Sequence, residues 1–178
     1  MSARSEEVGA RARELRRAFD LTFAAPPAVR ASAEAVLALG IGGDTYALRL
    51  SEIGGVFGDR PVTPLPGRVP AFLGIAAIRG ALVPVYSLAA LLARPAEAAP
   101  RWLVLAGSRG KVGLAFDRLE GHFRGATTLA TRAEERDGAR HHVRATIALG
   151  ERTVPLIDIG SVIQAIERAV PTAENEER

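Results

Sequence analysis

Apolar residues recur along this chain first at helical spacing and then at strand spacing. In the first 24 residues they return every three or four positions, at Val8, Ala12, Leu15, Phe19 and Phe23. This spacing predicts an amphipathic N-terminal helix with Ser5 as its cap. The sequence "AAPPA" at 24–28 ends it, because proline cannot continue a helix. A linker is expected to follow, to about residue 33.

Beyond residue 33, short β-prone runs predict strands. "AVLALG" and "YALRLSEI" flank the turn-rich "IGGDT", which predicts a hairpin. "GDRPVTPLPGRVP" holds too many prolines for a central strand and predicts an exposed, stiff loop. "AFLGIAAI" and "ALVPVYSL" then flank the pair Arg79-Gly80, which marks a bend at the surface. "SLAALLA" predicts a short helix that Ser87 caps.

The strand pattern occurs twice. "VLALGIGGDTYALRLSEIGGVF" (36–57) aligns with "WLVLAGSRGKVGLAFDRLEGHF" (102–123) at a shift of 66, and "AAIRGALVPVYSLAALL" (76–92) aligns with "IALGERTVPLIDIGSVI" (147–163) at a shift of 71. Ser87 thereby matches Asp158. Internal similarity indicates two copies of one supersecondary unit, packed together about a pseudo-twofold axis because each is too small to bury a good core alone.

Composition narrows the class of protein. The 178 residues are 48% hydrophobic and 24% charged, which is typical of a globular protein, and contain no cysteine, so a reducing cytoplasm is expected. The N-terminus lacks the apolar core of a signal peptide. The charge-free run after Arg79 is too short, and too interrupted by glycine and proline, to span a membrane. A net charge of +3 gives little support to a nucleic-acid surface.

Three near-matches to chemical motifs fail on their context. "GIGGDT" has Thr45 in place of the third glycine of a dinucleotide fingerprint, and "AGSRG" has Ala106 in place of the first glycine of a nucleophile elbow. The adjacent His141 and His142 would point to opposite faces of an extended segment and share a metal poorly. No spaced carboxylate pair suggests acid and base catalysis. We therefore expect no enzyme, no metal site and no cofactor.

The run "YALRLSEIGGVF" with "PVTPLPGRVPAFLGIAAIRGALVPVYSLAALL" resembles the CheW-like domain, the coupling protein of bacterial chemotaxis arrays. "VGLAFDRLEG", with Gly113 and Asp117, and "ALGERTVPLIDIGSVI" extend the resemblance through the second half. The resemblance implies a mainly β fold of two SH3-like five-stranded barrels around a shared apolar core. The domain is expected at 34–170, divided near 34–97 and 98–170 with strand exchange possible at that boundary, between the N-terminal helix and linker (1–33) and a charged tail (171–178).

The resemblance also implies a non-catalytic adaptor that joins chemoreceptor signalling tips to the regulatory domain of a CheA-type histidine kinase, in the cytoplasm at membrane-associated or cytosolic arrays. Its expected partners are that kinase, a methyl-accepting chemoreceptor and further copies of the chain in array rings, with no nucleic acid and no membrane insertion. The residues expected to bind protein are Leu50, Glu52, Ile53, Gly74, Ile78, Arg79, Gly80 and Asp117.

Some alternatives stay open at this point. Arg79 either projects to a partner or stabilises its bend by bonding a nearby carbonyl. Ser87 stands where the family usually has aspartate, and "AIRG" replaces the commoner "NLRG", which changes the polar surroundings of Arg79. The rival functions are a small-ligand-binding β-barrel, which would need a closed pocket with convergent polar groups, and a nucleic-acid-binding barrel.

Overall fold

The computed structural model describes residues 34–67, 69–96, 99–107, 112–131 and 142–169, all within the compact unit Ala33–Arg178. The predicted N-terminal helix and the charged tail lie outside the described residues. Within them, no helix is long and apolar enough to cross a membrane. The described chain is mainly β. Its strands are β1 (Glu34–Ile41), β2 (Asp44–Arg49), β3 (Ile53–Gly58), β4 (Phe72–Ile78), β5 (Ala81–Ser87), β6 (Trp102–Ala106), β7 (Val112–Phe116), β8 (Arg118–Thr131), β9 (Val143–Leu149) and β10 (Arg152–Ile157).

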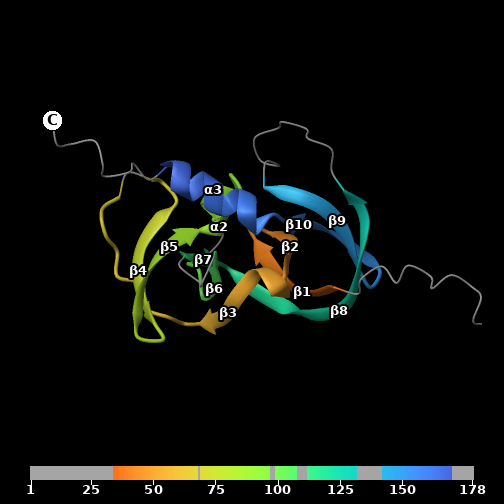
Figure 1. The fold of residues 1–178 in the computed structure, drawn as a ribbon, viewed down its shortest axis with the longest axis horizontal. Coiled ribbons are helices and arrows are strands. Elements are labelled where there is room, and N and C mark those ends of the chain that lie inside the picture. Colours follow the sequence, from red (N-terminus) through yellow and green to blue (C-terminus); the bar gives the residue numbers. More distant parts are fainter. Residues whose placement is uncertain (1–33, 68, 97–98, 108–111, 132–141, 170–178) are drawn as a thin grey trace, which may run out of the picture. The chain divides into compact units, whose positions relative to one another are not determined.

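The ten strands form two five-stranded sheets (Figure 1). The first barrel is closed, in the order β1-β2-β10-β9-β8, and the second sheet has the order β3-β6-β7-β5-β4. Under the shifts of 66 and 71, β1 to β5 fall on β6 to β10, so both sheets have one strand order. This confirms the predicted fold class of two similar five-stranded β-units.

The two repeats exchange strands. The first barrel takes β1 and β2 from the first repeat and β8, β9 and β10 from the second, while the second sheet takes the remaining strands of each. The chain crosses between the sheets at the short 3-10 helix η1 (Leu50–Glu52) and, in the second repeat, at Asp117 between β7 and β8. Each sheet is therefore assembled from both halves of the sequence.

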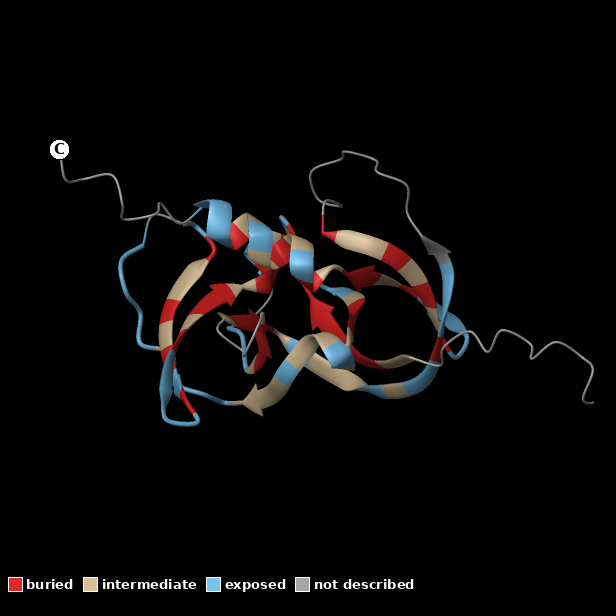
Figure 2. Cartoon of the chain, in the orientation of Figure 1, coloured by how far each residue is buried: buried red, intermediate tan, exposed pale blue. Residues whose placement is uncertain are grey.

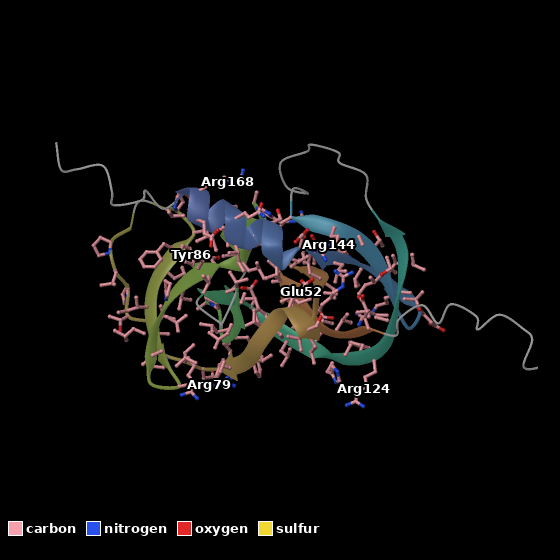
Figure 3. The ribbon with its side chains drawn as sticks, viewed as in Figure 1. Glu52, Arg79, Tyr86, Arg124, Arg144 and Arg168 are labelled. Carbon is pink, nitrogen blue, oxygen red and sulfur yellow. The ribbon has the colours of Figure 1, made fainter. Side chains whose placement is uncertain are left out.

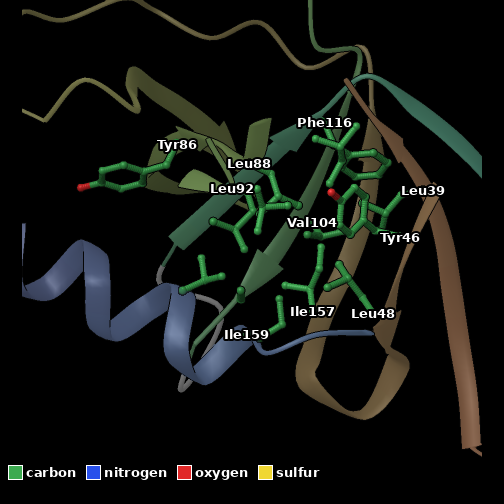
Figure 4. Packing of buried hydrophobic residues seen from close by; sticks show 14 of the residues in the cluster. Leu39, Tyr46, Leu48, Tyr86, Leu88, Leu92, Val104, Phe116, Ile157 and Ile159 are labelled. Atoms are coloured by element: carbon green, nitrogen blue, oxygen red, sulfur yellow. The ribbon is translucent and has the colours of Figure 1, made fainter. Parts of the chain in front are cut away.

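Strands β1 and β6 are buried on both faces. Along β1, Leu37, Leu39 and Ile41 face the core shared by the two sheets, while Val36 and Ala38 face the interior of the first barrel. A strand covered on both faces has no polar face, which explains the continuous apolar runs in β1 and β6. A third cluster, centred on Val85 and Leu103, fills the second sheet. Figure 2 shows this burial along the central strands, and Figure 4 shows the shared core.

Two helices cover the shared core. Helix α2 (Leu88–Leu91) begins after Ser87, whose hydroxyl accepts a hydrogen bond from the Ala90 backbone N–H at 3.2 Å, as the sequence predicted. Helix α3 (Ile159–Ala169) begins after Asp158, the residue that matches Ser87, and Asp158 Oδ1 accepts from the Ser161 backbone N–H at 3.1 Å. The buried stripe of α3, formed by Ile159, Val162 and Ile166, packs on the strands beneath it (Figure 1).

The predicted hairpin at "IGGDT" is confirmed. Strands β1 and β2 pair from Ile41↔Asp44 outward, and Gly42 and Gly43 form the two-residue turn with φ angles of 55° and 83°. Positive φ at both central positions is the signature of a type I′ turn, whose twist matches that of the strands. The loop between β3 and β4 is exposed along most of its length, also as predicted.

Candidate protein-binding site

Arg79 and Gly80 form the two-residue turn of the β4–β5 hairpin. The strands pair up to Ile78↔Ala81, and the φ angles of Arg79 and Gly80 are 51° and 80°. The left-handed region costs a residue with a side chain roughly 1–2 kcal/mol, and in the second repeat the position of Arg79 is taken by Gly150, with φ of 62°. The first repeat thus carries an arginine in a backbone conformation for which the second repeat uses glycine, the residue that adopts it without strain. Strain of this kind concentrates at functional sites.

The Arg79 side chain reaches from the hairpin across to β3. Its Cζ lies 5.3 Å from the centroid of the Phe57 ring, and Nη1 donates a weak hydrogen bond to the Gly54 carbonyl at 3.4 Å. Gly55 leaves room for it, since a Cβ there would lie 3.2 Å from Nη2. Arg79 does bond a carbonyl, but one that is 25 residues away in sequence. The residue remains exposed, at the end of the hairpin in Figure 3.

An exposed surface surrounds this turn, here called the hairpin surface: Arg60, Ala77, Arg79, Gly80, Ala81 and Leu82. Leu82 is 72% exposed, the largest value among the exposed large apolar residues of the described chain. Arg60 contacts the same aromatic ring, with its Cζ 5.8 Å from the Phe57 centroid. Exposed leucine beside arginine and a half-buried aromatic ring is the composition of a protein interface, in which arginine and aromatic residues are enriched.

Two of the predicted site residues in this region lie inside the fold. Ile78 is only 3% exposed and belongs to the interior cluster of the second sheet. Gly74 has φ of 136°, and a Cβ on it would lie 2.0 Å from the Thr63 carbonyl oxygen. Thr63 pairs with Ile75 through two backbone hydrogen bonds, of 2.8 and 3.0 Å. Gly74 therefore allows the proline-rich loop to pack on β4.

The other predicted residues lie at the two crossovers between the sheets. Leu50 and Ile53 are partly buried and pack against the shared core. Asp117 Oδ2 accepts a hydrogen bond from the Gly42 backbone N–H at 3.1 Å, which ties the second crossover to the β1–β2 turn. The hydrogen bond from Arg79 to the Gly54 carbonyl brings Arg79 next to the first crossover, because Gly54 directly follows Ile53. Asp117 is engaged elsewhere, at the β1–β2 turn.

Glu52 belongs to a charge network that joins four elements. Its Oε1 is 3.4 Å from Arg49 Nη1 and 3.2 Å from Arg144 Nη1, and Arg49 also contacts Glu34. Arg144 binds both oxygens of Asp158, at 3.1 and 3.0 Å, so the network reaches the start of α3. Glu52 Oε2 is the buried side-chain oxygen of the described chain that lacks a hydrogen-bond partner. Figure 3 shows Glu52 and Arg144 near the centre of the domain, away from Arg79.

The network sets the charge of Asp158. Burial alone would raise the pKa of this carboxyl, but hydrogen bonds from Arg144 and from the backbone N–H groups of Ser161 and Gly160 outweigh it and hold the pKa below its ordinary value. Asp158 therefore stays ionised at neutral pH. A negative charge at the first turn of α3 also interacts favourably with the helix dipole.

Other features give little sign of small-molecule chemistry. An open hollow of about 540 Å³ lies where β2 and β10 diverge, lined by Asp44, Thr45, Tyr46, Arg94, Arg152, Thr153, Val154 and Pro155. Arg94 is already paired there with Asp44 and with the Tyr46 hydroxyl. Across the described ranges, no group of three or more histidine, cysteine or acidic side chains is placed to hold a metal ion.

Sequence reasoning missed Phe57, Arg60 and Leu82. Phe57 was visible only as the final matched aromatic of the repeat. Nothing in the linear order of the chain placed it against Arg79, because the two strands concerned are not hydrogen-bonded to each other. The exposure of Leu82 could have been inferred from its place in a strand that begins just after a tight turn.

Paired five-stranded β-sheets of one strand order, with a shared core and an exposed hairpin, define the domain as a double SH3-like unit. The family model of the CheW-like domain matches residues 35–167, and the chain belongs to that family, whose members are scaffolds of chemotaxis rather than enzymes. The chain is also similar in fold to the scaffolding protein TtCheW from Thermoanaerobacter tengcongensis, with a TM-score of 0.61, 15% identity, and coverage of 70% of this chain and 88% of that one. A search of curated proteins found no match.

Proposed function

We propose that this protein is a non-catalytic adaptor that couples the signalling tips of chemoreceptors to the regulatory domain of a CheA-type histidine kinase. The observation that carries the proposal is the match of the CheW-like domain over residues 35–167, nearly the whole described unit. The adaptor would act in the cytoplasm at chemoreceptor arrays, where copies of the chain would associate in rings.

The hairpin surface is the part of the molecule that we assign to partner binding, with Arg79 at its centre. Arg79 occupies a strained backbone position, is exposed, and is held in place by Phe57 and Gly54. An arginine fixed before binding loses less side-chain entropy when a partner docks. Leu50, Glu52 and Ile53, at the first crossover where β3 begins, are further residues that we assign to partner binding.

Calorimetric titration of the full chain with a purified receptor-tip fragment, and separately with the kinase regulatory domain, tests the proposal. We expect both to bind, and we expect Arg79→Ala to weaken at least one of them by about thirtyfold, the equivalent of about 2 kcal/mol. Arg124→Ala is the matched control, because Arg124 is an exposed arginine of the first barrel, far from the hairpin surface in Figure 3. Binding of neither protein by the unaltered chain would refute the adaptor role.

A further inference from the structure

The first barrel is closed by a short contact between the parallel strands β2 and β10. In the described chain these strands share one register pair, Leu156↔Ala47. The equivalent strands of the second sheet, β7 and β5, share a longer run that begins at Val85↔Gly113. The open hollow of about 540 Å³ lies before Leu156 and Ala47, between the first residues of β2 and β10, and is called the β2–β10 hollow here.

A proline in β10 deprives one carbonyl of β2 of its ladder donor. The two-residue turn makes Ile41↔Asp44 a hydrogen-bonded pair, so the next residue, Thr45, turns its backbone groups away from β1 and toward β10. In the register of the parallel pair, the Thr45 carbonyl would accept from the backbone N–H of residue 155. Residue 155 is a proline, which has no N–H. The hollow therefore has a backbone acceptor at Thr45 that β10 cannot satisfy.

A buried hydroxyl belongs to the wall of the same hollow. Tyr46 is only 3% exposed, and its hydroxyl oxygen accepts a hydrogen bond from Arg94 Nε at 2.9 Å. A phenol can donate as well as accept, and among the described residues no acceptor takes up the hydrogen of this hydroxyl. Because hydrogen bonds polarise one another, a hydroxyl that accepts from a guanidinium is a better donor.

β10 supplies further donors to the lining. The Arg152 side chain is 60% exposed, and its contact with Glu120 is long, at 3.6 Å. Thr153 is exposed and contributes a second hydroxyl. The acid of the lining, Asp44, is already paired with Arg94 at 3.1 Å. The polar groups left to a ligand are thus hydroxyls and a guanidinium, which suit an oxyanion, together with the Thr45 carbonyl, which needs an N–H.

We propose that the β2–β10 hollow binds the carboxyl-terminal end of a partner's polypeptide chain. The last residue of a chain carries both groups that the lining calls for, a carboxylate and, beside it, a backbone N–H for Thr45. Capture of a terminal carboxylate is a recurring mode of peptide recognition. A volume of about 540 Å³ accommodates a short peptide end, and the open side lets the preceding residues leave toward solvent.

This assignment goes beyond the adaptor function that we propose for the chain. The β2–β10 hollow belongs to the first barrel, whereas the hairpin surface belongs to the second sheet. A ligand in the hollow would therefore add a second attachment point, used by a partner with a free chain end.

The test uses the full chain and two synthetic N-acetylated peptides of alanine and valine that differ only at the C-terminus. One ends in a free carboxylate and the other in an amide. In amide NMR, we expect the free-acid peptide to shift the signals of Thr45, Tyr46 and Thr153. The amidated peptide should bind at least about tenfold more weakly, because it lacks the charge. Equal binding of the two peptides, or shifts centred on the hairpin surface, would overturn the proposal.

Acetate and inorganic phosphate test whether the hollow requires a chain end. Both supply an oxyanion, but neither brings a backbone N–H for the Thr45 carbonyl. We expect each to bind at least about tenfold more weakly than the free-acid peptide. If either bound as tightly as that peptide, the hollow would be a general oxyanion site and the assignment to a chain end would be wrong.

Variants of the lining identify the groups that hold the carboxylate. Tyr46→Phe removes the hydroxyl and keeps the ring in the core, and Arg152→Gln removes an exposed charge. Each should weaken the free-acid peptide by about tenfold and leave the amidated peptide less affected. Arg124→Ala is the matched control, because Arg124 is an exposed arginine of the same barrel outside the lining, and it should bind the peptide like the unaltered chain.

The two lining variants also guard against a loss of folding. Tyr46 is buried, so the amide spectrum of Tyr46→Phe must first match that of the unaltered chain, whereas Arg152 is exposed and its replacement does not disturb the core. Unchanged peptide binding in Arg152→Gln and in a folded Tyr46→Phe would overturn the proposal. Because no residue of the hairpin surface is altered, failure here leaves the receptor and kinase measurements intact.

Discussion

The guanidinium of Arg79 lies 5.3 Å from the centroid of the Phe57 ring, although these residues belong to segments with no hydrogen-bonded ladder between them. This contact joins the tip of the β4–β5 hairpin to β3, the strand that carries Phe57. A cation over an aromatic face at an exposed site contributes about 0.5–1 kcal/mol. The contact therefore offsets part of the backbone strain at Arg79 without removing it.

Replacing Arg79 by glycine should separate stability from binding. The change relieves a positive φ and loses the Phe57 contact, two effects of similar size and opposite sign, so the free energy of unfolding should stay within about 1 kcal/mol of the original. Affinity for the receptor tip, the kinase regulatory domain or both should fall by about thirtyfold, as for Arg79→Ala. Thermal melting and calorimetry on one preparation measure both. A variant that binds normally but melts far earlier would make Arg79 a structural residue.

Gly74→Ala should be among the most damaging single substitutions in the domain. Its Cβ would lie 2.0 Å from the Thr63 carbonyl, and its φ of 136° disfavours any side chain. We expect a loss of about 3 kcal/mol or more in chemical denaturation. Gly125→Ala is the control, since Gly125 also has positive φ but nothing lies within 4 Å of the added Cβ, and its cost should be about 1 kcal/mol. Equal losses of stability in the two variants would show that the loop moves to relieve the clash with the added Cβ.

Arg144→Ala should destabilise the fold through the charge network. The variant removes the two bonds to Asp158 and leaves Glu52 with Arg49 as its remaining described partner. We expect a loss of about 1–2 kcal/mol, because two partly buried carboxylates, Glu52 and Asp158, each lose a charged donor while keeping their other partners. Arg152→Ala serves as comparison, since Arg152 is exposed and its contact with Glu120 is 3.6 Å long, so it should cost at most about 0.5 kcal/mol. If both substitutions lowered the free energy of unfolding by the same amount, the charge network would contribute no more stability than an exposed ion pair.

The depressed pKa of Asp158 predicts a dependence of stability on acid. A carboxyl whose folded pKa lies below its unfolded value adds stability that is complete above the unfolded pKa, near about 4, and is lost as the pH falls through the folded value. Asp158→Asn, which keeps a capping side chain, should remove this contribution. Denaturation of both proteins between neutral pH and about pH 2 should show their stabilities converging at the acid end. Parallel curves would contradict the prediction.

Local features of the fold were predictable because they depend on neighbours in sequence. Glycine pairs between apolar runs set the β1–β2 turn, and Ser87 followed by a short apolar run set α2 and its cap. The repeat matched Asp158 to the capping Ser87, and in the structure Asp158 does cap the helix that follows it. Proline content predicted the exposed loop before β4.

Features that depend on which strands meet in space were not predictable in the same way. The contact of Arg79 with Phe57 requires two segments that are separated by the loop and by other strands of the sheet. The roles of Gly74 and Ile78 as packing residues follow from the position of Thr63 and from burial, which the family motif does not reveal. A residue that matches a family motif can stabilise the fold or bind a partner, and only the contacts of that residue in the structure distinguish the two roles.

The exchange of strands between the two repeats has a consequence for how the protein is made. Strands β1 and β2 are translated before β8, β9 and β10, with which they form the first barrel. The β1–β2 hairpin can form at once, but its buried faces stay without partners until β10 has been made. Pairings between distant segments also slow folding. During translation the nascent chain should therefore depend on chaperones to shield these apolar strands from aggregation.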